Sequence, residues 1–194
     1  MIEKIDDRTL LVSTKKTSLL LVVNEANKVS LEFFGPRLQK EEVKSIYHPT
    51  AFMQGSAALY NKDVPNYSLS QAKLILSTLG KGDLFSPSVS MENDLTTLFD
   101  FTFASFKINE EVVPMTILPF PHGGKEEVII KLEEKQNQVE AEIHLLPFEE
   151  EDVYGEYLVI HNTSEREVRI KKAASLLLPL EDQEDTLLSL SGIW

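Results

Sequence analysis

Histidines and carboxylates are the residues of this sequence that could bind a metal or transfer a proton. Metal-binding histidines commonly stand two residues apart on a strand or four apart on a helix. The four histidines keep neither spacing; they are His48, His122, His144 and His161. His144 also falls on the polar side of an alternating stretch, where a solvated side chain is expected. We therefore predict no metal site.

The carboxylates are abundant, with 31 acidic residues against 19 basic ones. A pair could stand at the separation that glycosidases use, but a catalytic acid needs a desolvated or like-charged setting to tune its pKa. Most acids here lie in runs, such as 149–152 and 181–185, or alternate with apolar residues along strands. This pattern indicates solvated charge. We expect no catalytic residue and no cofactor in this chain.

Two glycine-containing stretches could suggest phosphate-binding loops. Gly123–Gly124 lacks the Lys-Ser end of a P-loop, and a predicted strand follows it instead of a helix. Residues 80–83, Gly-Lys-Gly-Asp, have the composition of a turn in which Asp83 caps its own backbone. Both stretches are predicted to be ordinary turns.

Aromatic residues gather in and beside one stretch without a regular period, residues 40–67. They are Phe33, Phe34, Phe52, Tyr60 and Tyr67. Such side chains can stack on sugar rings, but more often they pin a loop to the core. Both readings remain open, with packing the commoner one. We expect this irregular segment to lie on a partner-facing side, since long loops in compact domains usually serve a function or are poorly ordered.

The composition excludes several classes of protein. Without cysteine there is no disulfide framework, thiolate nucleophile or sulfur-bound zinc. The formal net charge of −12 repels phosphate backbones and anionic membranes, so neither nucleic acid nor a membrane is an expected partner. The longest apolar run, Leu19–Val23, is far shorter than a membrane span, and the first residues lack a signal-peptide pattern. We expect a cytoplasmic protein.

Period-two alternation, interrupted every eight to twelve residues by turn chemistry, dominates the sequence. Strands are expected at Thr9–Thr14, Ser18–Glu25, Val29–Gly35, Phe99–Ile108, Val128–Leu132, Val139–Leu145, Tyr154–Asn162, Glu167–Leu178 and Thr186–Ser191. Near-helical spacing of leucines allows one or two helical turns in Ser68–Leu79. The pattern predicts an all-β fold, a sandwich of two antiparallel sheets of the supersandwich type, with at most one or two short helices.

Turn composition also predicts which strands are neighbours. The polar link 134–138 should join Val128–Leu132 to Val139–Leu145 as an antiparallel hairpin with one wet face. The link 163–166 should join Tyr154–Asn162 to Glu167–Leu178 in the same way. Within Phe99–Ile108, alternation places Phe103 and Phe106 on opposite faces.

Several short segments occur in a characteristic order. They are Leu31–Leu38 (LEFFGPRL), Tyr67–Leu69 (YSL), Gly80–Pro87 (GKGDLFSP), Asp100–Phe103 (DFTF), Ala173–Ser175 (AAS) and Leu187–Trp194 (LLSLSGIW). Together they resemble the N-terminal domain of glycoside hydrolase family 36, the bacterial α-galactosidases. The match is collinear over nearly the whole chain.

The resemblance implies a β-sandwich that precedes a TIM-type barrel with two catalytic aspartates and a small C-terminal β-domain. It implies retaining hydrolysis of terminal α-galactosides such as melibiose and raffinose, without metal or nucleotide. We expect residues 1–194 to be one non-catalytic N-terminal domain that ends before the barrel. Its expected partners are the barrel of the same polypeptide and further copies of the chain in a homo-oligomer.

The sequence departs from the family pattern at several positions, two of them in a loop that in some members lies at the edge of a galactoside pocket. Phe85 and Phe106 replace an arginine and a histidine of the family motifs, and Met53 and Pro65 stand where some members carry an acid and an arginine. We therefore assign no sugar-binding residue here. Two alternatives from other classes stay open: a free-standing carbohydrate-binding β-sandwich and a protein-interaction domain. A reading frame that continues past Trp194 would favour the α-galactosidase.

Overall fold

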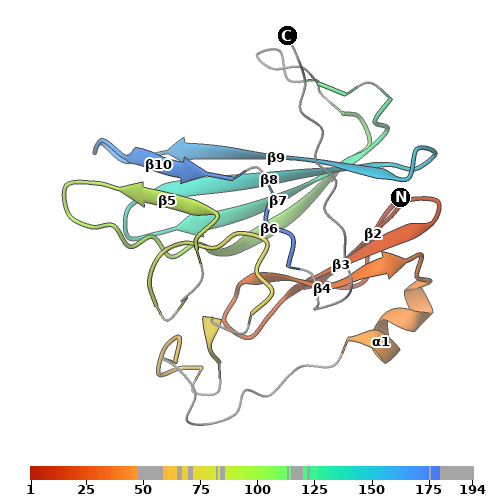
Figure 1. Cartoon of the computed structure of the whole chain (residues 1–194), viewed down its shortest axis with the longest axis horizontal. Coiled ribbons are helices and arrows are strands. Elements are labelled where there is room, and N and C mark those ends of the chain that lie inside the picture. Colours follow the sequence, from red (N-terminus) through yellow and green to blue (C-terminus); the bar gives the residue numbers. More distant parts are fainter. Residues whose placement is uncertain are drawn as a thin grey trace.

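The computed structural model describes residues 1–47, 59–64, 67–69, 72–81, 83, 86–112, 114, 120–121, 123–174 and 176–179. Its strands are β1 (Ile2–Lys4), β2 (Thr9–Ser13), β3 (Thr17–Val23), β4 (Val29–Pro36), β5 (Val89–Glu92), β6 (Thr102–Asn109), β7 (Glu127–Glu134), β8 (Val139–Phe148), β9 (Val153–Asn162) and β10 (Arg169–Ala173). Two sheets, β1-β2-β3-β4 and β6-β7-β8-β9, form the two layers seen in Figure 1. The all-β, antiparallel sandwich is confirmed. The strand expected at Thr186–Ser191 lies outside the described residues.

The two central strands of the first sheet, β2 and β3, are buried on both faces. Residues of β2 and β3 are apolar in sequence, without alternation, because one face meets the sandwich core and the other is covered by a short helix, α1 (Val43–Ile46). Leu11 and Leu20 pack with Val43 of that helix, whereas Leu10 and Leu21 face the core. A continuous apolar run is the pattern expected of a strand buried on both sides.

Turns of the two main hairpins follow local sequence chemistry. Asn27, between β3 and β4, has φ 56°, and Gln138, between β7 and β8, has φ 55°. The Asn24 Oδ1 atom accepts hydrogen bonds of 3.1 Å from the backbone amides of Ala26 and Lys28. The predicted pairing of β7 with β8 across residues 134–138 is confirmed.

The core lies between the two four-stranded sheets. Val139, Ala141, Ile143 and Leu145 of β8 all point into it, as their alternation predicts. Leu10 and Val12 meet them from the opposite layer. Burial of these side chains is the main favourable term that holds the sheets together.

A β-bulge in β6 reverses the predicted alternation, so that side chains after the bulge point to the opposite face of the strand from the one expected. The register with β7 shifts between Phe103 and Ser105. As a result, the Phe103 and Phe106 rings lie 4.6 Å apart between centroids, and both pack against the core cluster. The prediction that they occupy opposite faces is wrong, because the extra residue of a bulge reverses the phase of the strand.

The predicted hairpin of Tyr154–Asn162 with Glu167–Leu178 does not form. β9 pairs with β8, whereas β10 pairs with β5, a strand that the sequence did not reveal. An ion pair accompanies this pairing, with Lys171 Nζ of β10 2.5 Å from Glu92 Oε2 of β5. The backbone adds a hydrogen bond of 2.8 Å from the Ala174 amide to the Ser88 carbonyl.

Helical structure occurs where the sequence suggested irregular backbone. A 3₁₀ turn, η1 (Lys40–Glu42), precedes α1, whereas residues 72–79 contain no helix. There the chain pairs with the edge of β4 through hydrogen bonds from Leu31 N to Lys73 O and from Ile75 N to Val29 O. None of the helices in the described ranges has the length and apolar character that a membrane crossing requires.

Candidate functional site

A polar cluster, the Asp100 cluster (Asp100, Lys28, Lys81 and Tyr60), joins the segment that carries Tyr60 to the sandwich; Lys28 and Tyr60 are buried, whereas Lys81 is exposed. The Lys28 ammonium group donates to Asp100 Oδ1 and to the Phe101 carbonyl. The Tyr60 hydroxyl donates to Asp100 Oδ2 at 2.8 Å, and Lys81 Nζ lies 2.7 Å from the same oxygen. One carboxylate thus organises three side chains from distant parts of the sequence.

Burial and charge act against each other in this cluster. Burial would raise the pKa of Asp100, but Lys28, Lys81 and the Tyr60 hydroxyl outweigh it, so its pKa lies below the ordinary value. Burial lowers the pKa of Lys28, an effect that Asp100 partly offsets. Burial and the neighbouring carboxylate both raise the pKa of Tyr60, whose phenol therefore stays protonated. The cluster is an ion pair with a neutral hydroxyl donor.

Tyr60 and Tyr67, from the same segment, pack against each other. The two rings meet edge to face with centroids 6.4 Å apart, and Asn24 Nδ2 lies 2.5 Å from the Tyr67 hydroxyl oxygen. Lys28 and Lys81 lie 5.3 and 5.2 Å from the centroid of the Tyr60 ring, within cation–π range. Both tyrosines are buried, so they pin the segment to the core. Phe52 lies outside the described residues.

A cleft of about 340 Å³ opens beside the Asp100 cluster. It runs between the turn around Gly80, the loop 93–98 and the β7–β8 turn. Its lining combines aliphatic and polar side chains: Leu69, Thr78, Leu79, Gly80, Lys81, Leu95, Thr96, Leu98, Phe99, Asp100, Glu134, Gln136 and Asn137. Asp100 is held by Lys28 and Lys81 and is therefore not a free acid or base.

His144 is buried, contrary to the predicted wet face. Its ring stacks on Tyr157 with centroids 4.2 Å apart, and its Nδ1 atom lies 3.3 Å from Glu127 Oε2. The Phe120 ring covers Tyr157 from the side. Alternation within β8 could not reveal this cover, because it comes from β9 and from residue 120. His161 is half exposed, while His48 and His122 lie outside the described residues.

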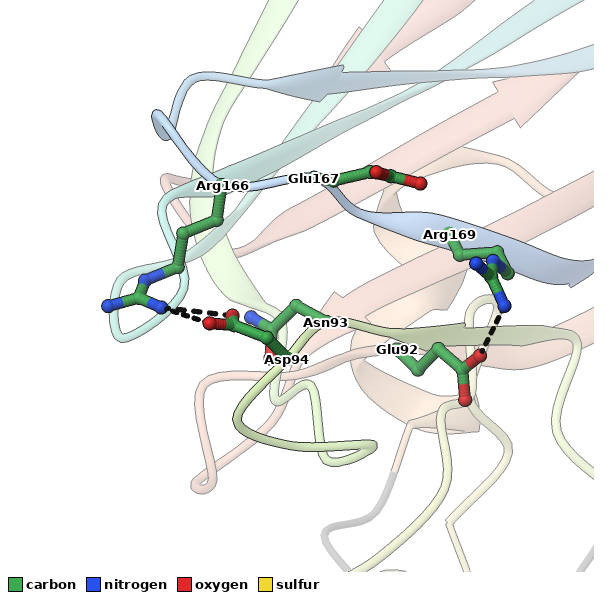
Figure 2. Close-up of a pocket in the computed structure, with 6 residues that line it drawn as sticks. All are labelled: Glu92, Asn93, Asp94, Arg166, Glu167 and Arg169. Atoms are coloured by element: carbon green, nitrogen blue, oxygen red, sulfur yellow. Dashed lines mark hydrogen bonds and ion pairs between the residues drawn. The ribbon is translucent and has the colours of Figure 1, made fainter.

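A second cleft, of about 490 Å³, lies between the loop after β5 and the start of β10 (Figure 2). Arg166 Nη1 contacts both oxygens of Asp94 at 2.7 and 2.9 Å, and Arg169 Nη1 lies 3.5 Å from Glu92 Oε1. Both pairs are exposed to solvent. Surface pairs of this kind stabilise a fold only slightly, and their charges are matched with one another.

Two further observations concern possible chemistry. Across the ranges that the structure describes, no group of three or more His, Asp or Glu side chains is placed to hold a metal ion. Glu156 of β9 has its pKa raised to about 7 by burial. It lies opposite Leu145 in the register and so faces the interior between the sheets, not either cleft.

Comparison with known proteins identifies the family. Residues 27–194 match the model of the glycosyl hydrolase family 36 N-terminal domain. No curated protein sequence matches the chain.

Three solved α-galactosidase structures share the fold. The family 36 enzyme AgaB from Geobacillus stearothermophilus is 12% identical, with a TM-score of 0.80 over 91% of this chain and 24% of its own. The galactosidase domain of the α-galactosidase–sucrose kinase AgaSK is 21% identical, with a TM-score of 0.78 over 91% and 25%. A variant of AgaA from G. stearothermophilus in complex with raffinose is 14% identical, with a TM-score of 0.77 over 87% and 24%.

The chain therefore spans about a quarter of the length of the structures that it matches. At these identities, the likeness establishes the fold. The match to the family model covers most of the chain. This protein belongs to glycosyl hydrolase family 36 and corresponds to the N-terminal domain of that family.

Proposed function

We propose that this chain is the non-catalytic N-terminal β-sandwich domain of a cytoplasmic α-galactosidase, supporting a catalytic barrel and the assembly of an oligomer. The observation that carries the proposal is the match of residues 27–194 to the N-terminal domain of the family. The solved structures that share the fold include three α-galactosidases, and this chain covers about a quarter of each of them.

The chemistry of the described residues supports a structural role. Asp100 is neutralised by Lys28 and Lys81 and accepts a hydrogen bond from Tyr60. Glycoside hydrolysis needs two carboxyl groups that flank one scissile bond in an accessible cleft. Glu156, the carboxyl group whose pKa is raised to about 7, faces the interior of the sandwich. Asp100 therefore acts as a structural counter-charge.

The proposed substrates are terminal α-galactosides of the melibiose and raffinose type. The support is the fold shared with AgaA, which was solved in complex with raffinose. The substrate would bind to the catalytic part of the parent polypeptide. Residues of this chain are not assigned a role in its recognition.

The test compares the chain with its parent polypeptide on a chromogenic α-galactoside and on raffinose. We expect turnover by the full-length polypeptide and none by residues 1–194 alone, because the two catalytic carboxylates would lie in the barrel. The size of the native polypeptide, measured by mass spectrometry of protein from the source cells, gives an independent readout. A native chain that ends at Trp194 would favour a free-standing binding or interaction domain. Turnover by residues 1–194 that survives repurification would contradict the non-catalytic role.

A further inference from the structure

Three leucines protrude around the cleft beside the Asp100 cluster. Leu95 is 69% exposed, Leu98 51% and Leu79 47%, and all three line that cleft. Single exposed leucines are normal on a protein surface, but several around one cleft make an apolar patch of the kind that marks an interaction site. We call Leu79, Leu95 and Leu98 the leucine rim.

Hydrogen bonds hold the loop that carries two of these leucines. Asn93 Oδ1 accepts from the backbone amides of Leu95 at 2.9 Å and Thr96 at 2.8 Å. Thr96 Oγ1 accepts from the Leu98 amide at 3.0 Å. Asn93 Nδ2 also donates to Asn137 Oδ1 at 2.9 Å, which ties the loop to the β7–β8 turn. A loop ordered in advance loses little conformational entropy on docking.

Leu98 packs against Gly80, although half of the leucine surface is exposed. Gly80 has φ +108°, and a Cβ atom at this position would lie 2.5 Å from Leu98 Cδ2. The absence of a side chain at Gly80 therefore allows Leu98 to lie over the turn. Leu98 thus packs closely over the Gly80 turn with one side of its side chain.

Several acids near the rim are paired within the chain, and Glu134, a further acid of the cleft lining, is buried and accepts a hydrogen bond of 2.5 Å from the Asn137 amide. The pairs are Asp94 with Arg166, Glu92 with Arg169 and Lys171, and Asp100 with Lys28 and Lys81, the first two acids being visible in Figure 2. The exposed surface of the rim itself is formed by the three leucines. Such a surface is suited to an apolar, uncharged partner surface.

We propose that the leucine rim is a docking surface for an apolar, uncharged surface of the same polypeptide beyond Trp194. The proposal rests on the proposed function, in which this chain is the front quarter of a longer enzyme. Leu95 and Leu98 would enter the partner surface as paired anchors, with the ion pairs at the margin. Removal of their exposed apolar surface from water would favour docking.

Photo-cross-linking of the full-length polypeptide tests the proposal. A benzophenone amino acid replaces Leu95, and the products of irradiation are mapped by mass spectrometry. We expect a species of monomer mass in which position 95 is joined to a residue beyond 194. The additional substitution Leu98→Ser should reduce its yield several-fold. The matched control places the same amino acid at Lys15, an exposed residue of the β2–β3 turn near Glu150, at the other end of β8 from Asn137.

Each other outcome contradicts the inference in a distinct way. A product of twice the monomer mass would assign the rim to a second copy. Absence of a product at position 95, in a polypeptide that hydrolyses α-galactosides, would overturn the docking surface while leaving the proposed function intact. A full-length polypeptide without α-galactosidase activity would overturn the proposed function, and a native chain that ends at Trp194 would overturn both proposals.

Discussion

The Tyr60 hydroxyl donates a hydrogen bond of 2.8 Å to Asp100, a residue 40 positions away in the sequence. Asp100 also pairs with Lys28, which comes from the turn between β3 and β4. The contact therefore links three segments that share no local sequence pattern. It also explains why an aromatic residue of the irregular stretch is buried instead of being presented to a ligand.

Replacing Asp100 should destabilise the domain strongly. Asp100→Asn leaves the Lys28 ammonium group buried without a counter-charge, and we expect the free energy of unfolding to fall by about 3 kcal/mol. Because the pKa of Asp100 lies below its ordinary value of 3.8, this contribution is complete above about pH 4 and is lost as the pH falls through the lower, folded-state pKa. Urea denaturation of residues 1–194 at neutral and acid pH measures both effects.

Asp7→Asn is the matched control for that experiment. Asp7 pairs with Lys4 at 2.6 Å, but its side chain is almost fully exposed, and exposed pairs contribute little to stability. A second variant, Asp100→Asn with Lys28→Met, removes both charges and should regain part of the loss. Equal losses for Asp7→Asn and Asp100→Asn would show that the buried pair has no special weight.

Glu156 should make stability fall as the pH rises. In the unfolded chain this carboxyl group ionises near its ordinary value of 4.5, whereas burial raises the pKa in the folded state to about 7. Between these values the folded state binds more protons, so stability decreases from about pH 4.5 to pH 7 and then levels off. Glu156→Gln should remove this slope and stabilise the domain by about 1–3 kcal/mol at pH 8.

Thermal unfolding across pH 4 to 8 checks the Glu156 prediction. The control is Glu140→Gln, which changes an exposed glutamate of β8. The control should keep the slope of the unchanged chain. A slope that persists in Glu156→Gln would mean that another group is responsible.

Arg166→Ala should have almost no effect on stability. Although Arg166 contacts both carboxylate oxygens of Asp94, both side chains are about half exposed or more. We expect a loss below about 0.5 kcal/mol, further reduced by salt. A loss above about 1.5 kcal/mol in urea denaturation would indicate that the cleft of Figure 2 is an organised element of the fold.

Alanine at Gly80 should cost more than alanine at Gly123. Both glycines have positive φ, +108° and +97°, so each substitution carries backbone strain of about 1 kcal/mol. An added Cβ has open space at Gly123, whereas at Gly80 it must displace Leu98. Leu98→Ala in the same chain should remove the excess cost at Gly80. Identical losses at both glycines would mean that Leu98 moves aside freely.

Much of the strand content was predictable from the sequence because the information is local. Alternation along β8 placed its inward side chains correctly, and Asn27 and Gln138 stand where their hairpins need a left-handed residue. The continuous apolar character of Leu19–Val23 reflects a strand covered on both faces. The order of short motifs pointed to the family, which the match of residues 27–194 confirms.

Tertiary structure alone decided the pairing of β10 and the burial of polar groups. β10 follows β9 in the chain but pairs with β5, because the partner of a strand depends on contacts between segments that no local turn pattern encodes. The alternation within β8 predicts that His144 is exposed. It is buried because Tyr157 of the neighbouring strand β9 stacks on it. Asp100 resembles any other acid until folding surrounds it with Lys28 and Tyr60. A charge can be buried only where remote residues supply its counter-charge and hydrogen bonds, and only the folded chain brings them together.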